Sequence, residues 1–478
     1  RAHQTGMGDV AVDVAVLGGG ASGLSAARQL QSNGHRTVVL EASTRVGGRV
    51  LNDTTLTGKP HELGPEFVHG EAGNKLIELI DRQLNGRNGK PAAQLVELDW
   101  PNYYYMGKEG TMLSACDADQ LQEFQAMHDS FESLSEPDAE QHPEQSLLQY
   151  FAAQGLSSRV LDLADAVFAN DYGADMSEIG LHEVIAEQGA WRYGEKYLVL
   201  QGACLQDAME ALASSLNDVR TSWPVARVEL LPPEAVAARG PRVRVVSADG
   251  RIVLARRVVI SVPLAVLQRG DIKFAPQLPP WKQDAISAIR VGNALKVLLR
   301  LRKRFWPADF YDAVCADCFF PEVWLTPAAE AMRPEALPPF TMVGFVAGPR
   351  ATRVSALPPE RIARLLLQQL DGMFGTAETP RPATDACDGF LVKDWASHPH
   401  IHGAYSHPSL GGAGKRTSLA APVADALFFC GEACHEGVNP CIHGAMETGE
   451  ACGKRLSLSL GTEDKDGRGG GSQLRSKL

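Results

Sequence analysis

Three glycines near the start of the chain are spaced to bind the phosphates of a dinucleotide. They form the turn Gly18-x-Gly20-x-x-Gly23, between an apolar run, Val10–Leu17, and a helical stretch, Ala21–Gln31. Gly18 permits a tight turn, Gly20 lets the backbone approach a pyrophosphate, and Gly23 lets helix and strand pack closely. The N-terminus of the helix offers free N–H groups and a positive dipole end to the phosphate. The pattern indicates a nucleotide-binding βαβ unit.

An acid and a second glycine pair extend this unit. The next apolar run, Thr37–Leu40, ends in Glu41, where a carboxylate accepts hydrogen bonds from a ribose. In the segment Arg45-Val-Gly-Gly-Arg49, the two glycines let the backbone come close to a phosphate, and the Arg49 guanidinium is suited to bind a pyrophosphate. NAD enzymes do not need this extension, so the pattern favours a flavin dinucleotide.

A lysine stands inside an apolar run farther along the chain. Lys296 lies in Ala-Leu-Lys-Val-Leu-Leu, which reads as a strand. Burying an ammonium without partners is costly, so its place favours a functional role over a surface one.

Several collinear motifs resemble the flavin-containing amine oxidase family, which includes monoamine and polyamine oxidases. The resemblance covers roughly residues 12 to 455 and rests on the motifs that follow. They are Glu62-Leu-Gly-Pro-Glu-Phe-Val-His-Gly70, Trp223-Pro-Val225, Ser261-Val-Pro-Leu, Asn293-Ala-Leu-Lys296, Phe429-Cys-Gly431-Glu432-Ala and His443-Gly-Ala-Met-Glu-Thr-Gly449. The resemblance implies non-covalently bound FAD and no metal. It also implies oxidation of an amine to an imine, which water hydrolyses to an aldehyde, while O2 is reduced to H2O2.

The resemblance also assigns site residues. Cofactor contacts are expected from Gly18, Gly20, Gly23, Glu41, Arg49, Gly64, Glu66, Phe67, Val225, Trp395, Glu432 and Ile442. Catalytic or substrate contacts are expected from Lys296, Tyr405, His69, Asp171 and Cys441. In the family, the lysine holds a water at the flavin N5 edge, and two aromatic rings bracket the substrate amine. Here Tyr405 supplies one ring, and Cys441 stands at the position of the second, so one wall of the cage is expected to be small.

The substrate stays open at this point. His69 and Asp171 align with positions that select cationic nitrogens in polyamine oxidases, yet Asp171 equally suits a helix end or a turn. An L-amino-acid oxidase would need an arginine for the carboxylate, with Arg192 and Arg290 as candidates. A flavin desaturase of the same fold and a catalytically silent FAD-binding protein are further alternatives. The desaturase shares the glycine turn but not the lysine segment, and the intact lysine argues against the silent protein.

The order of the motifs predicts a mixed α/β fold in which a discontinuous Rossmann-like FAD domain encloses a substrate domain of sheet and helices. We assign residues 9–75, 218–270 and 420–458 to the FAD domain and residues 76–217 and 271–419 to the substrate domain. Within the latter, helical signals lie at 76–80, 117–135 and 161–168, strand-like runs at 295–301, 340–347 and 389–394, and a helix at 359–374.

Composition agrees with a globular enzyme of two or three domains. The chain has 478 residues, 44% of them hydrophobic and 22% charged. Its net charge of −11 argues against nucleic acid as a partner. No apolar run approaches the roughly 20 residues of a membrane anchor. The pair Cys315-x-x-Cys318 lacks a second pair or a histidine at zinc spacing, so ordinary thiols are expected.

The last segment, 459–478, is polar and glycine-rich, and we expect it to be flexible. It ends in Ser476-Lys477-Leu478, which matches a signal read by the peroxisomal import receptor. An enzyme that releases hydrogen peroxide suits that compartment. The sequence therefore predicts a peroxisomal location, with an amine and O2 as small-molecule partners.

Overall fold

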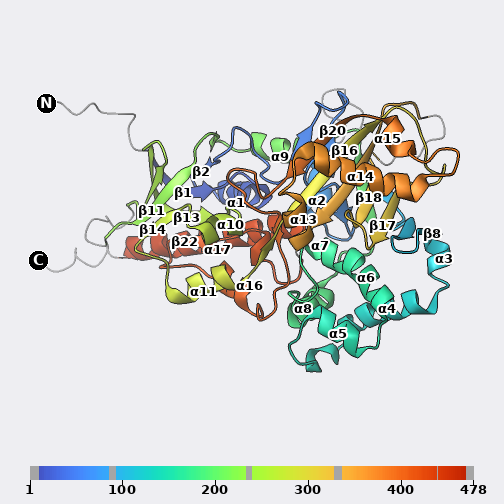
Figure 1. Ribbon diagram of the computed structural model, residues 1–478. Helices are drawn as coiled ribbons and strands as arrows, with labels where there is room; N and C mark the ends of the chain where they lie inside the picture. Colours follow the sequence, from blue (N-terminus) through green and yellow to red (C-terminus); the bar gives the residue numbers. More distant parts are fainter. Residues whose placement is uncertain (1–9, 85–92, 233–239, 328–335, 439, 470–478) are drawn as a thin grey trace, which may run out of the picture.

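The structure is a computed structural model that describes residues 10–84, 93–232, 240–327, 336–438 and 440–469. Its chain forms two lobes, which lie at the left and right of Figure 1. We call the left one, which contains the glycine turn, the dinucleotide lobe, and the other the second lobe. The mixed α/β class predicted from the sequence is confirmed.

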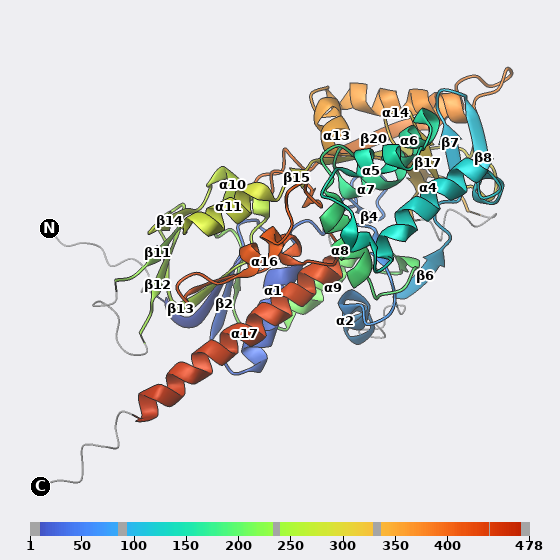
Figure 2. The same ribbon diagram turned by 90° about the horizontal axis from the view of Figure 1, so that it is seen from below.

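A mixed sheet forms the centre of the dinucleotide lobe. In spatial order its strands are β10 (Val219–Arg220), β2 (Thr37–Leu40), β1 (Val10–Leu17), β13 (Ile252–Ile260), β12 (Val243–Ser247), β11 (Val225–Leu230) and β14 (Lys273–Ala275), and β22 (Leu427–Phe429) also pairs with β13. The predicted βαβ unit is present, because β1 and β2 are parallel and α1 (Ala21–Ser32) connects them. Helix α17 (Ile442–Gly469), the last described element, packs along α1, the first described helix (Figure 2).

A second sheet spans the other lobe. Its strands are, in order, β20 (Cys387–Asp394), β16 (Ala294–Leu301), β19 (Phe340–Ala347), β18 (Glu322–Leu325), β17 (Asp312–Ala316), β7 (Tyr103–Met106) and β8 (Thr111–Ser114). Side chains alternate along β16 because successive residues of a strand point to opposite faces. Leu295 and Val297 pack in one core with the helix α14 (Pro359–Phe374), which begins and ends as predicted. Lys296 therefore points to the opposite face.

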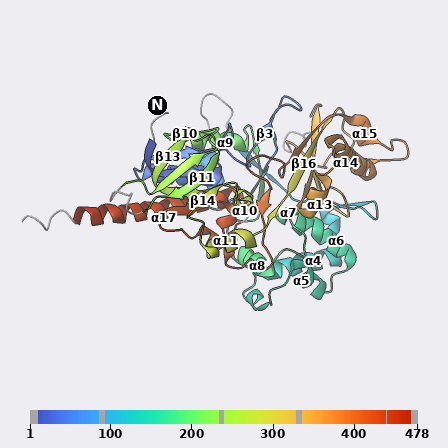
Figure 3. The same cartoon turned by 60° about the vertical axis from the view of Figure 1, so that its left-hand side comes forward.

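Helices and smaller sheets complete the molecule (Figure 3). Three short strands, β5 (Phe67–His69), β9 (Tyr197–Gln201) and β6 (Gln94–Leu98), form a sheet, and β15 (Val291–Gly292) pairs with β21 (Tyr405–Ser406), as β3 (Asn52–Asp53) pairs with β4 (His61–Glu62). The remaining helices are α2 (Lys75–Gln83), α3 (Ala115–Ala118), α4 (Gln122–Glu132), α5 (Leu147–Ala153), α6 (Ser158–Ala164), α7 (Asn170–Tyr172), α8 (Leu181–Ala190), α9 (Leu205–Ser214), α10 (Leu264–Arg269), α11 (Pro280–Ala288), α13 (Gly348–Val354), α15 (Pro382–Ala386) and α16 (Lys415–Ala420).

The expected limits of the domains need correction at two places. Residues 271–419 were assigned to the substrate domain, yet β14 pairs with β11 of the dinucleotide lobe. Helix α11 also belongs to that lobe, since Ala285 and Ile286 share a core with Val228 and Val258. The reason is that parallel pairing between distant segments leaves no local sequence signal.

The expected flexible tail also needs correction. The chain is helical through Gly469, as part of α17, although flexibility was expected from residue 459. The segment Ser476-Lys477-Leu478 lies outside the described residues, so its role stays a prediction. Among the helices of the described residues, none combines the length and the hydropathy needed to cross a bilayer.

We predict that Lys282 stabilises the dinucleotide lobe. Its side chain is fully buried in α11, and Nζ donates to the carbonyls of Ser418, Leu419 and Ala421 at distances between 2.5 and 2.8 Å, at the end of α16. Lys282→Met would leave these carbonyls unsatisfied and should lower the free energy of unfolding by about 1–3 kcal/mol. Chemical denaturation measures this change.

The matched control is Lys303→Met, because Lys303 is exposed. Its free energy of unfolding should stay within about 0.5 kcal/mol of the wild-type value. Equal losses in the two variants would contradict the role of Lys282.

Candidate functional site

A single cavity of about 790 Å³ collects nearly every residue that the sequence singled out. Of the predicted site residues, all but Gly23 line it. They are Gly18, Gly20, Glu41, Arg49, Gly64, Glu66, Phe67, His69, Asp171, Val225, Lys296, Trp395, Tyr405, Glu432, Cys441 and Ile442. These residues come from both lobes, so the cavity runs from the glycine turn to the sheet of the second lobe.

The glycine turn fits a dinucleotide phosphate. Gly18 adopts φ +106°, which side-chain-bearing residues rarely tolerate, and a Cβ on Gly23 would stand 2.1 Å from the Gly18 carbonyl oxygen. Gly23 does not line the cavity. Because it has no side chain, it lets α1 approach β1. Ser22, in the first turn of α1, lines the cavity, and its buried Oγ has no partner among the described residues. An anion at this helix N-terminus would satisfy that hydroxyl and the free N–H groups.

The other expected cofactor residues also fit an extended dinucleotide. Glu41 is buried, and its carboxylate accepts hydrogen bonds from Gly19 N at 2.6 Å and Ser43 N at 2.8 Å. These bonds fix its orientation and leave lone pairs for a ribose hydroxyl. Arg49 pairs with Glu432 at 3.0 Å. These residues would hold FAD between them.

Lys296 is buried and partnered at the face of the second sheet. Its Nζ lies 3.3 Å from Glu66 Oε2 and donates to the Glu62 carbonyl oxygen at 3.2 Å. The Trp324 indole, whose ring centroid is 5.0 Å from Nζ, donates to the same Glu66 oxygen at 3.0 Å. The ammonium is thus held in one place, which is the requirement for a group that positions a water or a reacting atom.

Glu62, beside this pair, carries a proton near neutral pH. Burial is the main cause that raises its pKa to about 8, and the nearby Glu66 carboxylate adds to the shift. Its Oε1 accepts a hydrogen bond from Leu205 N at 2.7 Å, at the start of α9.

Tyr405 forms one wall of the cavity with little freedom to move. It pairs with Gly292 across β15 and β21, and a Cβ on Gly173 would stand 2.8 Å from the ring. Burial, reinforced by the carboxylates of Asp171 and Glu322, raises the pKa of the Tyr405 phenol well above its usual value. The ring therefore stays neutral.

Cys441, just before α17, also lines the cavity. Burial raises the pKa of its thiol, and the carboxylates of Glu187 and Asp171 add to this. The structure therefore brings a small neutral side chain to the same cavity as the Tyr405 ring.

Asp171 projects into the cavity rather than closing a helix on the surface. Its side chain is exposed to the cavity space, while the surrounding protein disfavours its charge and raises its pKa to about 7. Glu322 lines the same cavity and is 5% exposed. Burial, followed by repulsion from Asp171, raises the pKa of Glu322 well above its usual value. The Asn170 amide donates to Glu322.

Sequence reasoning missed Glu322, Trp324 and Glu187, all of which line the cavity. The signal for Glu322 was available, because it interrupts the apolar run from Phe319 to Leu325 as Lys296 interrupts its own. Glu187 lies in α8, where polar and apolar residues are mixed, so it does not interrupt an apolar run.

His69 and His443 bring neutral imidazoles to the cavity. Burial lowers the pKa of His69 to about 4. Burial also lowers the pKa of His443 to about 4, and the nearby His69 contributes to that shift. The Nε2 atom of His443 is buried and has no hydrogen-bond partner in the described part of the chain. The His69 ring stands edge-on to Tyr197 at 4.9 Å between centroids. Both neutral rings can accept a hydrogen bond, but their lowered pKa values make them poor proton acceptors near neutral pH.

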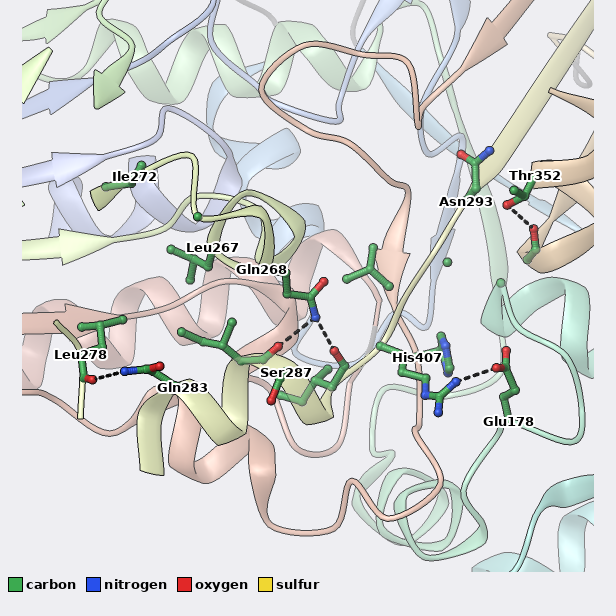
Figure 4. Close-up of a pocket in the computed structure, with 18 of the residues that line it drawn as sticks. Glu178, Leu267, Gln268, Ile272, Leu278, Gln283, Ser287, Asn293, Thr352 and His407 are labelled. Carbon is green, nitrogen blue, oxygen red and sulfur yellow. Dashed lines mark hydrogen bonds and ion pairs between the residues drawn. The ribbon is translucent and has the colours of Figure 1, made fainter. Parts of the chain in front are cut away.

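A second cavity of about 1160 Å³ lies beside α10, α11 and α13 (Figure 4). Gln268 donates there to the carbonyls of Ile286 and Ile289, and Arg290 pairs with Glu178 at 2.6 Å. The described residues that line it include Arg290, a candidate for binding a substrate carboxylate, but none of the predicted catalytic or cofactor residues. Volume alone therefore does not identify the site, and the first cavity is where the chemical groups converge.

The described residues contain no group of three or more His, Cys, Asp or Glu side chains arranged to hold a metal ion. Cys315 is buried and Cys318 partly buried, at the turn between β17 and β18.

Comparisons with known proteins agree with this site. The model of the family described as flavin containing amine oxidoreductase matches residues 21–456. Polyamine oxidase 2 of Arabidopsis thaliana is 28% identical over 94% of this chain and 90% of its own length. A putrescine oxidase structure with bound putrescine superposes with a TM-score of 0.75 at 19% identity, covering 95% of this chain and 100% of that one.

The cyclohexylamine oxidase of Brevibacterium oxydans superposes with a TM-score of 0.73 at 21% identity, covering 95% of this chain and 99% of that one. At these identities the solved structures show that the fold is shared. The family model spans most of the sequence, and the glycine turn, the buried lysine and the closing motif meet in one cavity. The chain therefore belongs to the family of flavin-containing amine oxidoreductases.

Proposed function

We propose that the protein is a peroxisomal oxidase that holds FAD non-covalently and oxidises an amine carrying more than one cationic nitrogen. The observation that supports this substrate is the set of carboxyl groups from Asp171, Glu187 and Glu322 in the cavity beside Tyr405. The raised pKa values of Asp171 and Glu322 mean that the compensation of their charge by the protein is incomplete, although the Asn170 amide and Lys296 partly offset the burial of Glu322. A substrate cation would supply that compensation.

The chemistry that bound FAD supplies is the two-electron oxidation of the C–N bond to an imine, with O2 as the final acceptor and H2O2 as product. The chain supplies the binding and orientation. Asp171 and Glu322 hold a distal ammonium of the substrate. The Tyr405 ring packs against the carbon chain of the substrate, near the nitrogen to be oxidised. That nitrogen must be neutral, and the imidazole of His69, whose pKa burial lowers to about 4, stays neutral and can accept a hydrogen bond from it without taking its proton.

The alternative of an L-amino-acid oxidase finds less support. Of the candidate arginines, Arg192 pairs with Glu447 and Arg290 with Glu178, and neither lines the cavity. Arg49 is the only arginine among the described residues of the lining, and Glu432 already neutralises it. A substrate carboxylate would therefore meet negative charge.

Non-covalent attachment is supported by the cysteines of the closing segment. Cys430 and Cys434 are buried outside the cavity lining, and Cys441 lies near Asp171 and Glu187. The peroxisomal location is supported by the sequence Ser476-Lys477-Leu478 and by the peroxide that the reaction releases. Acid precipitation should leave the yellow cofactor in the supernatant, whereas a yellow pellet would refute non-covalent binding.

A panel of amines tests the proposed substrate class. Purified holoenzyme is given spermine, an N-acetylated polyamine, phenethylamine, tyramine and an L-amino acid, and peroxide release is measured. The highest kcat/KM should fall among the amines with several nitrogens. A preference for phenethylamine or for the amino acid would overturn the proposal.

We predict a pH-dependent KM that Asp171 controls. Because the pKa of Asp171 is about 7, the carboxyl loses its charge below that pH and gains it above. The KM for spermine should therefore fall as pH rises through about 7, relative to the KM for phenethylamine, which carries one nitrogen. Asp171→Asn should remove this trend and raise the spermine KM at pH 8 roughly tenfold, or ~1.4 kcal/mol. An equal rise for both amines would contradict the assignment.

We predict that Lys296→Met retains fold and cofactor but slows turnover roughly 10²-fold, since it removes a charge fixed beside the reacting groups. Stopped-flow measurement of the reductive and the oxidative half-reaction locates the loss. Arg300→Met is the control, because Arg300 lies on the same strand, pairs with Asp388 at 2.7 Å and stands outside the cavity lining. Unchanged rates in both half-reactions of Lys296→Met would refute the role.

We predict that Cys441→Tyr narrows the substrate range. A second ring opposite Tyr405 would add aromatic contact near the nitrogen, worth about 0.5–1.5 kcal/mol. The kcat/KM of phenethylamine relative to spermine should rise several-fold, as measured on the amine panel. If the ratio of kcat/KM for phenethylamine to that for spermine is the same in Cys441→Tyr and the wild type, Cys441 packs beside the substrate site without forming its wall.

A further inference from the structure

A chain of charged and polar groups, all buried except the partly exposed Arg49, connects the two lobes beside Tyr405. Its members, Arg49, Glu432, Ser406, Arg416 and Glu183, are called here the buried ion chain. Arg49 pairs with Glu432 at 3.0 Å, the Ser406 hydroxyl donates to Glu432 Oε2 at 2.6 Å, and Arg416 Nη1 donates to Ser406 Oγ at 3.0 Å. Arg416 Nε then meets Glu183 Oε1 at 3.2 Å.

Positive and negative groups alternate along this chain, which is how buried charge is tolerated. Arg416 is 3% exposed, and its guanidinium also donates to the Ala433 carbonyl oxygen at 3.3 Å. A guanidinium can bind several acceptors at fixed angles, which an ammonium cannot. Removing Arg416 would take the guanidinium away from Glu183 Oε1 and from Ser406 Oγ, so these two groups depend on it for their place.

The buried ion chain holds Tyr405 on both sides along the backbone. Arg49 Nη1 donates to the carbonyl oxygen of Ala404 at 2.7 Å, just before the tyrosine. Ser406, just after it, is fully buried, and its hydroxyl lies between Glu432 and Arg416. Neither neighbour of Tyr405 can shift without breaking one of these hydrogen bonds.

The aromatic ring of Tyr405 is tightly packed against its neighbours. Gly173 and Gly292 approach so closely that a Cβ on Gly292 would stand 1.9 Å from the Gly173 carbonyl oxygen. The Tyr405 ring rests against Gly173, in the segment that carries Asp171. A displacement of Ser406 is therefore transmitted to the ring and to the substrate wall.

We propose that Arg416 is a positioning residue for amine oxidation, which acts through Ser406 and Glu432 to fix the Tyr405 ring relative to the cofactor and the substrate. Arg416 itself does not line the cavity. The inference rests on the proposed role of Tyr405 as a wall of the amine site. Misplacement of a substrate-positioning group by about 1 Å can cost up to roughly 10²-fold in rate.

A double-mutant cycle on the FAD-loaded enzyme tests the proposal. Arg416→Lys and Ser406→Ala are each made in the wild type and in Tyr405→Ala, and kcat and KM for spermine are measured by peroxide release. We expect each substitution to lower kcat/KM about tenfold in the wild type and less than about threefold in Tyr405→Ala, because coupled groups are not additive. Arg300→Lys, which changes a partly exposed arginine, is the control and should change neither value.

Equal losses in both backgrounds, or no loss in the wild type, would overturn the proposal. A merely structural role would produce equal losses, together with a lower thermal midpoint. If Arg416→Lys fails to retain FAD, Ser406→Ala decides the question, because it removes one hydroxyl and keeps the guanidinium. Tyr405→Ala alone tests the tyrosine: unchanged kcat/KM there refutes its role in the proposed function, whatever the cycle shows.

Discussion

The cost of enclosing charge in a low-dielectric cavity governs this structure. The protein compensates some buried charges by pairing them. Lys296 Nζ, for example, lies 3.3 Å from Glu66 Oε2, and this contact fixes the position of both groups. Where burial outweighs the compensating contacts, as for Asp171 and Glu322, the pKa values of the carboxyl groups rise because burial penalises the ionised forms. The first arrangement fixes the position of an ammonium group. The second is where the proposed substrate cation would bind.

The site also depends on backbone contacts that only glycines permit. A Cβ on Gly64 would stand 1.9 Å from the carbonyl oxygen of Arg49, and a Cβ on Gly292 would stand 1.9 Å from that of Gly173. The first contact joins two of the expected cofactor segments, and the second joins the segment that carries Asp171 to the strand that pairs with Tyr405. Because three separated stretches of sequence build the dinucleotide lobe, the cavity forms only when distant segments have come together.

Local patterns were sufficient for the elements with a clear period or a clear turn. Both strands of the βαβ unit, the strand Phe340–Ala347 and the helix Pro359–Phe374 have the predicted bounds, whereas α1 ends at Ser32, one residue beyond its predicted end. Lys296 was identified by its contrast with an apolar strand. Pairings between distant segments were not predictable, so β14 was placed in the wrong domain. The helical extension of α17 to Gly469 was missed because its composition is polar and glycine-rich. Glu322 was missed although its apolar neighbours carried the same signal as those of Lys296.

The protonation states along the cavity suit a substrate with nitrogens of two kinds. Burial keeps His69 neutral above about pH 4, so it meets a nitrogen that has lost its proton without repelling or charging it. Asp171 ionises near pH 7 and gains most from a nitrogen that keeps its charge. Desolvation causes both shifts, and it acts in opposite directions on acids and bases. One cavity therefore presents a neutral acceptor and an ionisable acid at the same pH, which is what the proposed polyamine substrate would require.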